Sequence, residues 1–176
     1  MLNLVPNKAN KLEITPPKVK LGTVGNTLNI EFEHNYELAP HVSEKFGHEY
    51  QNWGLWDYDV FEVFLTRNES SKLPYLEIQV SPLNQKFALL INKPRENTEY
   101  PKSCPFQAKT EFSGDLWKSS ISIDIQDIPG ESETINGNIH AILGTPRNYF
   151  SMNVNPEEAP DFHRPEYFTD ILKARP

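Results

Sequence analysis

The sequence has few of the features that mark several large protein classes. Among its 176 residues Cys104 is the single cysteine, so an internal disulfide and a cysteine-based metal site are both excluded. The longest purely apolar run, residues 87–91, is far shorter than the roughly 20 residues of a membrane span. Glycine is scarce as well, with 8 residues against 15 prolines. Prolines at this frequency break long helices and suit short strands separated by turns.

Positive charge is also in short supply. Lys and Arg total 17 against 24 Asp and Glu, which gives a net charge of −7. Nucleic acids and anionic membranes both require a basic surface, so neither is expected as a partner. Residues 1–20 contain no apolar segment of the kind found in signal peptides. We therefore expect a cytoplasmic protein if Met1 is the native start, and the compartment is otherwise unknown.

What the sequence does contain is a globular composition with strand periodicity. Hydrophobic residues make up 38% and charged residues 23%, and the length suits a single domain over residues 1–176. Apolar and polar residues alternate over residues 28–33, 60–65, 75–80 and 117–125, which is the period of a β-strand. About seven to ten strands are expected, enough for two packed sheets. The predicted fold class is all-β, an antiparallel two-sheet β-sandwich of immunoglobulin-like or jelly-roll-like form.

Turn residues separate the expected strands. The tripeptide at residues 113–115 and the Asn84-Gln85 pair each connect two strands as hairpins, and Asn136-Gly137 begins another strand that ends near Leu143. Only short helical turns are expected, within residues 36–49.

The most unusual chemistry lies in residues 53–65, which read WGLWDYDVFEVFL. Glu62 shares a strand face with Val60 and Phe64, so its carboxylate must find donors or a cation, or shift its protonation. A sugar would suit this region, because its C–H face packs on aromatic rings and its hydroxyls donate to a carboxylate. Alternatively, Trp53 and Trp56 anchor a loop on the core and Glu62 pairs with a basic residue.

Catalysis is not indicated. Glycoside hydrolysis needs two carboxyl groups that face each other across a bond, whereas Asp59 and Glu62 point to opposite faces of a strand. Glu77 could complete a pair from a neighbouring strand, but no motif marks it. Nucleophile-elbow, phosphate-loop, zinc-protease and dinucleotide motifs are all missing from the sequence. We expect His163, within DFHRPEYF, to tie the C-terminal segment to the domain through ring hydrogen bonds.

Four segments in order resemble family 9 carbohydrate-binding modules, which belong to the DOMON-like β-sandwich group. The tryptophan-containing loop and D-x-x-E-V-F strand of residues 53–65 come first, and YLEIQVSPLNQ at residues 75–85 follows. Next come LWKSSISIDIQDIP at residues 116–129 and NPEEAPDFHRPEYF at residues 155–168. The resemblance extends over residues ~25–172 and implies a DOMON-like sandwich that binds carbohydrate.

The resemblance also implies a binding site. In the family two tryptophans clamp a terminal sugar ring, while a glutamate, an arginine and amide side chains bond its hydroxyls. Trp53 or Trp56 matches the first clamp, and Glu62 matches the strand glutamate. The predicted carbohydrate-binding residues are Trp53, Trp56, Asp59, Glu62, Gln79, Arg147, Asn148 and Asn153.

The sequence departs from the family at the second clamp, where Val154 stands in place of tryptophan. The loss of one ring would remove about 1–3 kcal/mol of burial and stacking. Tyr58, Tyr75 or Tyr149 is a candidate for a replacement ring. The strand at residues 75–80 also lacks the family arginine, so Arg147 would have to reach the sugar from elsewhere.

Other readings stay open. The wider group includes haem proteins with Met and His ligands, for which Met152 with His163 or His140 are candidates here. No cofactor is required by the sequence, but the family often carries structural calcium, with Asp57, Asp59 and Asp161 as candidate ligands. The domain could also bind another small molecule or a protein partner instead of a sugar.

Overall fold

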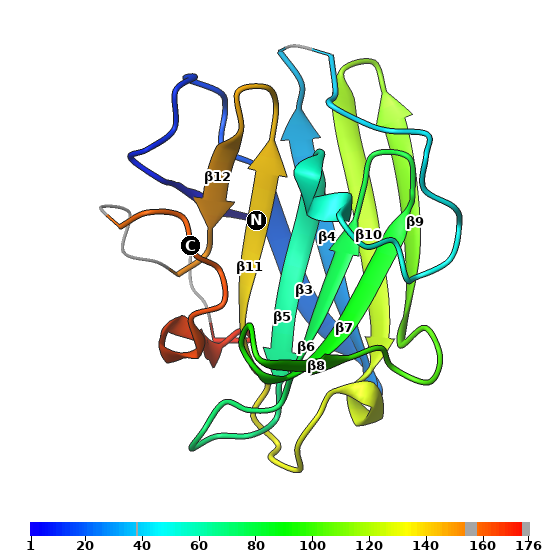
Figure 1. Ribbon diagram of the computed structural model, residues 1–176, viewed down its shortest axis with the longest axis vertical. Coiled ribbons are helices and arrows are strands. Elements are labelled where there is room, and N and C mark those ends of the chain that lie inside the picture. Colours follow the sequence, from blue (N-terminus) through cyan, green and yellow to red (C-terminus); the bar gives the residue numbers. More distant parts are fainter. Residues whose placement is uncertain (38, 154–157, 174–176) are drawn as a thin grey trace.

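Two antiparallel sheets pack face to face in the computed structural model, which describes residues 1–37, 39–153 and 158–173 (Figure 1). The predicted two-sheet β-sandwich is thus confirmed. The sheet that contains β5 and β11 faces the viewer in Figure 1, and the sheet that contains β3, β4 and β10 lies behind it. No helix in the described part of the chain is long and apolar enough to cross a membrane.

The rear sheet has the strand order β1-β3-β4-β10-β9. Its strands are β1 (Leu2–Asn3), β3 (Lys18–Val24), β4 (Thr27–Asn35), β10 (Leu116–Asp124) and β9 (Phe106–Ser113). Strand β10 pairs with β4 from Leu116 opposite Asn35 to Asp124 opposite Thr27, so the alternation predicted from the sequence runs the full length of both strands.

The front sheet has the order β2-β12-β11-β5-β6-β7-β8, with β13 also paired to β11. Its strands are β2 (Val5–Pro6), β12 (Asn148–Ser151), β11 (Asn136–Leu143), β5 (Val60–Thr66), β6 (Tyr75–Val80), β7 (Lys86–Lys93), β8 (Asn97–Glu99) and β13 (Thr169–Asp170). Short 3-10 helices lie between strands at η1 (Leu55–Asp57), η2 (Ile125–Asp127) and η3 (Pro165–Tyr167).

Aromatic rings from both sheets form the centre of the sandwich. The Phe61 ring on β5 stacks on Phe32 at 4.2 Å and on Trp117 at 4.1 Å between ring centroids. Successive side chains on a strand alternate between faces, so Val63 and Leu65 follow Phe61 into the same core. Burial of each such side chain contributes about 1.5–3 kcal/mol.

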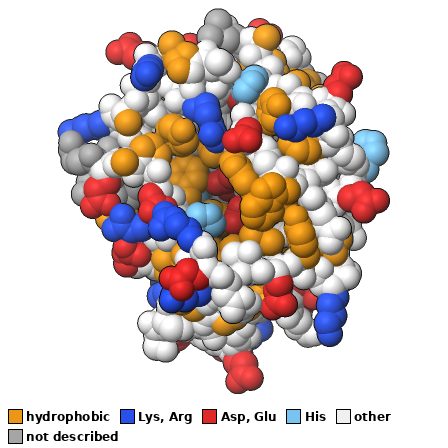
Figure 2. All heavy atoms as spheres, in the orientation of Figure 1, with side chains coloured by type: hydrophobic (Ala, Val, Ile, Leu, Met, Phe, Trp, Pro, Cys, Tyr) orange, Lys and Arg blue, Asp and Glu red, His pale blue; other side chains and the backbone are white. Residues whose placement is uncertain are grey.

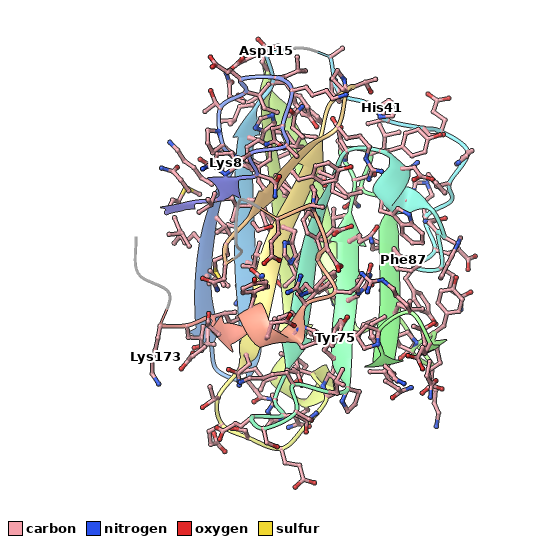
Figure 3. All side chains as sticks on the ribbon, turned by 60° about the vertical axis from the view of Figure 1, so that its left-hand side comes forward. Lys8, His41, Tyr75, Phe87, Asp115 and Lys173 are labelled. Atoms are coloured by element: carbon pink, nitrogen blue, oxygen red, sulfur yellow. The ribbon has the colours of Figure 1, made fainter. Side chains whose placement is uncertain are left out.

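The outer face of β5 and β6 is also buried. A second cluster, which includes Val60, Phe64 and Tyr75, lies on this side of the sheet. It is covered by residues from the 36–57 loop, such as Phe46, and from the C-terminal segment, such as Phe162. Figure 3 shows the C-terminal helix η3 beside Tyr75. Polar residues predicted to face away from the core therefore lie under a cover rather than in open solvent.

The predicted turns lie where expected. Strands β9 and β10 meet at a turn in which Gly114 has φ +61°, and Asn84 has φ +59° in the β6–β7 turn. The described residues of the 36–49 range, where short helical turns are expected from the sequence, contain a turn at residues 44–45 but no helix. The Gln85 amide in the β6–β7 turn donates a hydrogen bond of 2.7 Å to the Ser43 carbonyl oxygen, so a side chain satisfies this backbone group of the loop.

A glycine on β11 is required by the close approach of β5. A Cβ at Gly137 would lie 2.2 Å from the Phe64 carbonyl oxygen. We expect Gly137→Ala to lower the free energy of unfolding by about 1–3 kcal/mol, because the two strands must separate. Denaturant unfolding measures this change, and Gly22→Ala is the control because a Cβ there meets nothing within 4 Å. Equal midpoints for the two variants would contradict the predicted β5–β11 packing.

Candidate functional site

A groove of about 600 Å³ opens on the outer face of the front sheet. Figure 2 shows this hollow near the centre of the face, with hydrophobic side chains around it and acidic and histidine side chains inside. Strands β5 and β6 form its floor, the 53–57 segment forms one rim, and residues 160–163 lie along another side. The groove is therefore bounded by the two segments that cover this face.

Strand register brings the polar floor together. Glu62 on β5 lies opposite Gln79 on β6, and Phe64 lies opposite Glu77. Since side chains two residues apart share a face, both glutamates and Gln79 point to the groove. The Gln79 amide nitrogen donates a hydrogen bond of 2.7 Å to a Glu77 carboxylate oxygen. Glu62 and Glu77 are diagonal neighbours on adjacent strands, a relation that places Cβ atoms within about 7–8 Å.

The two floor carboxyl groups hold protons more tightly than usual. Burial and the neighbouring Glu77 carboxyl raise the pKa of Glu62 well above its ordinary value, and Arg147 opposes this rise. Burial raises the pKa of Glu77 to about 7, although the bond from Gln79 favours its ionised form. Among the described residues no hydrogen bond or ion pair reaches the Glu62 carboxyl. The pair therefore retains a proton near neutral pH.

Two tryptophans form the aromatic rim. Trp53 and Trp56 flank Gly54, which has φ +87° and begins η1. Their rings meet edge to face at 4.9 Å, and both contact the Phe87 ring on β7. Figure 3 shows Phe87 on β7, below this loop. Trp53 is 59% exposed, so a large part of this aromatic side chain is open to a ligand.

Arg147 and Tyr149 line the groove from the β11–β12 side. The Arg147 guanidinium lies 5.5 Å from the centroid of the Tyr149 ring. It also donates a hydrogen bond to the Trp56 carbonyl oxygen and lies 3.9 Å from an Asp57 carboxylate oxygen. Arg147 thus connects the tryptophan rim to strand β12.

His163 fastens the C-terminal segment, as predicted. Its Nδ1 lies 2.7 Å from the Tyr75 hydroxyl, and its Nε2 lies 3.9 Å from a Glu77 oxygen. Its ring stacks on Phe64 at 5.3 Å. Burial lowers the pKa of His163, while Asp161 opposes this effect. A neutral imidazole therefore lies beside Glu77 and supplies it with no full positive charge.

His140 on β11 lies directly opposite Glu62 in the sheet. Its Nδ1 lies 2.7 Å from the Ser151 hydroxyl, and its ring is covered by Phe162 at 4.0 Å. Burial, with the nearby His163, lowers the pKa of His140 well below its ordinary value. Its Nε2 is buried without a hydrogen-bond partner among the described residues.

The structure brings five of the predicted site residues into the groove. These are Trp53, Trp56, Glu62, Gln79 and Arg147. The alternative reading of Glu62 as one half of an ordinary ion pair does not fit its surroundings, since no basic side chain of the described chain lies within ion-pair distance.

Asp59 lies outside the groove lining and anchors a loop. Its carboxylate accepts hydrogen bonds from the Tyr36 hydroxyl at 2.8 Å and from the backbone N–H groups of His41 at 2.9 Å and Gly144 at 2.6 Å. These three bonds fix the segment that leads into the tryptophan rim. Asp59 is buried and does not line the groove.

Asn148 and Asn153 also lie outside the groove lining. The Asn148 amide donates to the carbonyl oxygens of Leu143 and Pro146 and thereby closes the turn before β12. The Asn153 amide donates to the Thr169 hydroxyl at 2.7 Å. Both amides are thus hydrogen-bonded within the protein. A sequence pattern cannot distinguish this structural role from contacts to a ligand.

The second clamp ring of the family has three candidate replacements in this sequence. Val154, at the expected place of the second clamp, lies outside the described residues. Of the three candidate tyrosines, Tyr149 lines the groove. Tyr75 is buried with its hydroxyl on His163, and Tyr58 contacts His41 and Phe46 away from the groove lining.

Sequence reasoning missed Glu77 as a site residue. Its strand alternation placed it on the outward face, where a glutamate is ordinarily solvated. The signal that could have found it is its diagonal position beside Glu62 once β5 and β6 are paired as a hairpin. The cover that buries both groups comes from segments distant in sequence.

The candidate metal and haem ligands do not converge. No group of three His, Cys, Asp or Glu side chains within the described ranges is arranged to hold a metal ion. Asp161 pairs with Arg95 at 2.6 Å, and Asp57 lies near Arg147. Met152 belongs to the core between the sheets, whereas His163 lines the groove on the other side of the sheet. His140, the other candidate ligand, has its ring against Phe162, so neither histidine shares the core environment of Met152 in the described chain.

Comparison with known proteins gives sequence relatives for about two thirds of the chain. No protein-family model matches the sequence. A UPF0462 protein C4orf33 homolog from Danio rerio is 30% identical over 124 residues, which cover 67% of this chain and 61% of the relative. The Mus musculus homolog is 32% identical over 122 residues, which cover 65% and 60%. The aligned region thus spans about three fifths of the length of these curated relatives.

Solved structures define the fold more fully. A Bacteroides uniformis protein to which carbohydrate binding is attributed matches with a TM-score of 0.71 at 12% identity, over 93% of this chain and 82% of that one. A family 9 carbohydrate-binding module from Caldicellulosiruptor kristjanssonii, solved with glucose, matches with a TM-score of 0.61 at 17% identity, over 94% and 82%. The chain therefore has the fold of family 9 carbohydrate-binding modules, and the wider DOMON-like assignment stays a prediction.

The proton held on the groove floor predicts a dependence of stability on pH. The folded pKa of Glu77, about 7, lies above its ordinary value of 4.5, so its contribution to stability is present below about pH 4.5 and is lost as the pH rises through 7. The Glu77→Gln variant has no carboxyl group at this position and does not lose this stability. Between pH 5 and pH 8 we therefore expect its free energy of unfolding to rise by about 2 kcal/mol relative to that of the wild type.

Denaturant unfolding at several pH values measures this difference. The lowered pKa values of His140 and His163 affect wild type and variant alike, so they largely cancel. Glu111→Gln, on exposed β9, is the control and should follow the wild type at every pH. Parallel profiles for Glu77→Gln and wild type would show that Glu77 titrates as an ordinary carboxylate.

Proposed function

We propose that the groove binds a sugar ring at the end of a carbohydrate chain and does not turn it over. The observation that carries this proposal is that exposed aromatic surface and a buried polar floor meet in one groove of about 600 Å³. A concave site with an apolar rim and a few convergent polar groups is typical of small-molecule recognition. The fold shared with a module solved with glucose gives further support.

The rim and the floor offer complementary contacts to a sugar. The exposed Trp53 ring and its neighbour Trp56 provide a surface for the apolar C–H face of the ring. Gln79 provides an amide oxygen without a partner in the described chain, and the Glu62 carboxyl, whose pKa burial raises, can accept hydrogen bonds and can also donate one when it holds a proton. Each hydrogen bond contributes about 0.5–1.5 kcal/mol net, so a dissociation constant on the order of micromolar to millimolar is expected.

The arrangement of the acids favours binding over hydrolysis. Glu62 and Glu77 are neighbours on one floor, on adjacent strands. Both would approach a sugar from the same side, whereas glycoside hydrolysis needs a proton donor and a second carboxylate that flank the scissile bond. The other two acids in the groove lining, Glu96 and Asp161, are paired with Lys93 and Arg95, which favours a role for the floor acids in recognition.

A sugar titration tests the proposed site. We expect the tryptophan fluorescence of the full chain to change in a saturable way with glucose, cellobiose or xylose oligomers. Trp53→Ala and Trp56→Ala should each weaken binding by about tenfold or more, because each removes part of the stacking surface. Chromatography of the sugar after incubation should return it unchanged.

The control variant is Phe112→Ala, which removes an exposed aromatic ring from β9 of the other sheet and should leave the affinity unchanged. Unfolding midpoints of all variants establish that they fold. Undiminished binding in both tryptophan variants would refute the assignment of the groove. The absence of any response up to tens of millimolar sugar would direct the search to other small molecules and to protein partners.

A further inference from the structure

We propose that the preferred ligand is an amino sugar whose protonated amine lies on the floor formed by Glu62, Glu77 and Gln79. This inference rests on the proposed sugar-binding function and specifies its ligand class. It concerns a feature of the groove that a neutral sugar leaves unexplained, namely two buried carboxyl groups side by side to which no Lys or Arg side chain of the described chain is bonded.

The basic side chains around the groove make their bonds away from the floor, although the charge of Arg147 acts on Glu62 and the Arg147 Nε has no hydrogen-bond partner in the described chain. Arg95 pairs with Asp161 at 2.6 Å, and Lys93 pairs with Glu96 at 2.5 Å. Arg147 bonds the Trp56 carbonyl oxygen and lies near Asp57. The basic group near Glu77 is the His163 ring, whose Nε2 lies 3.9 Å from a Glu77 oxygen and whose pKa is lowered by burial. No Lys or Arg side chain of the described residues is bonded to the floor carboxyl groups, so a ligand could supply the positive charge that would let both of them ionise.

The floor is also rich in acceptors that lack donors. The Gln79 amide oxygen is buried and has no hydrogen-bond partner in the described chain. The Glu62 carboxyl beside it likewise receives no hydrogen bond from the described residues. An ammonium group carries three N–H donors and no acceptor, which complements such a surface. A sugar hydroxyl carries a single donor and would leave part of this acceptor set unsatisfied.

Charge balance gives the same answer. A buried carboxylate without a counter-ion is strongly disfavoured, so the pair keeps a proton while the groove is empty. A cation between the two groups would let both ionise and would release that proton. The electron-rich faces of Trp53, Trp56 and Tyr149 in the groove lining would stabilise the same positive charge.

The first test compares three ligands that differ at one substituent. Glucosamine carries the protonated amine, N-acetylglucosamine carries the same nitrogen without charge, and glucose has a hydroxyl there. Calorimetric titration of the full chain at pH 7 should show glucosamine bound at least about tenfold more tightly than the other two. Glucose bound as tightly as glucosamine would overturn the inference and leave the proposed sugar-binding function intact.

The second test measures protons and needs no variant. Glucosamine titrated in two buffers of different ionisation enthalpy should show proton release, whereas glucose should show none. The affinity for glucosamine should rise from pH 5.5 to pH 7, because protons compete with the ammonium for the carboxyl pair. The other titratable or charged groups around that pair are His140, His163, Arg147, Arg95 and Asp161. Binding of glucosamine without proton release would contradict the proposed ion contact.

The third test distinguishes the contribution of the floor carboxyl groups to binding from that of the tryptophan rim. Glu62→Gln should weaken glucosamine binding by about tenfold and change glucose binding little, and Glu111→Gln on exposed β9 is the matched control. Methylammonium, an amine without a sugar, should bind far more weakly than glucosamine. Methylammonium bound equally well would refute both the amino sugar and the stacking role of the rim. No binding of any of the four ligands would reject the proposed function itself.

Discussion

The burial of polar side chains on the outer face of β5 and β6 is the constraint on which the site depends. Glu62, Glu77 and Gln79 would be ordinary solvated residues on the outside of a sandwich if this face were open. The 36–57 loop and residues 158–168 cover it, and the space left between these two segments is the groove. Burial then raises the proton affinity of the two carboxyl groups, so the same packing that shapes the groove also sets its chemistry.

The cover is held by specific polar contacts rather than by apolar packing alone. On one side Asp59 fixes the loop through Tyr36 and His41, and on the other side His163 fixes the C-terminal segment to Tyr75. Each of these bonds satisfies a polar group that would otherwise be buried unpaired. The segments that position the ligand contacts are thereby joined to the rigid sheet, which keeps the tryptophan rim near the polar floor.

The sequence was sufficient to predict the sandwich because strand alternation is a local signal. The faces of Phe61 and Leu76 and the turn at Gly114 follow from neighbours in sequence alone. The site was predicted in part, since Trp53, Trp56 and Glu62 lie within one short segment. Glu77 and the loop-anchoring role of Asp59 depend on contacts with residues far along the chain, which period and composition do not encode.

The central claim is that a sugar ring lies in the groove between the tryptophan rim and the carboxyl floor. A crystal structure of the chain with a saturating amount of sugar tests it most directly. The account predicts a ring in contact with Trp53 or Trp56, with a polar substituent within hydrogen-bond distance of Gln79 or Glu62. A ring bound on another surface, with the groove filled only by water, would contradict it.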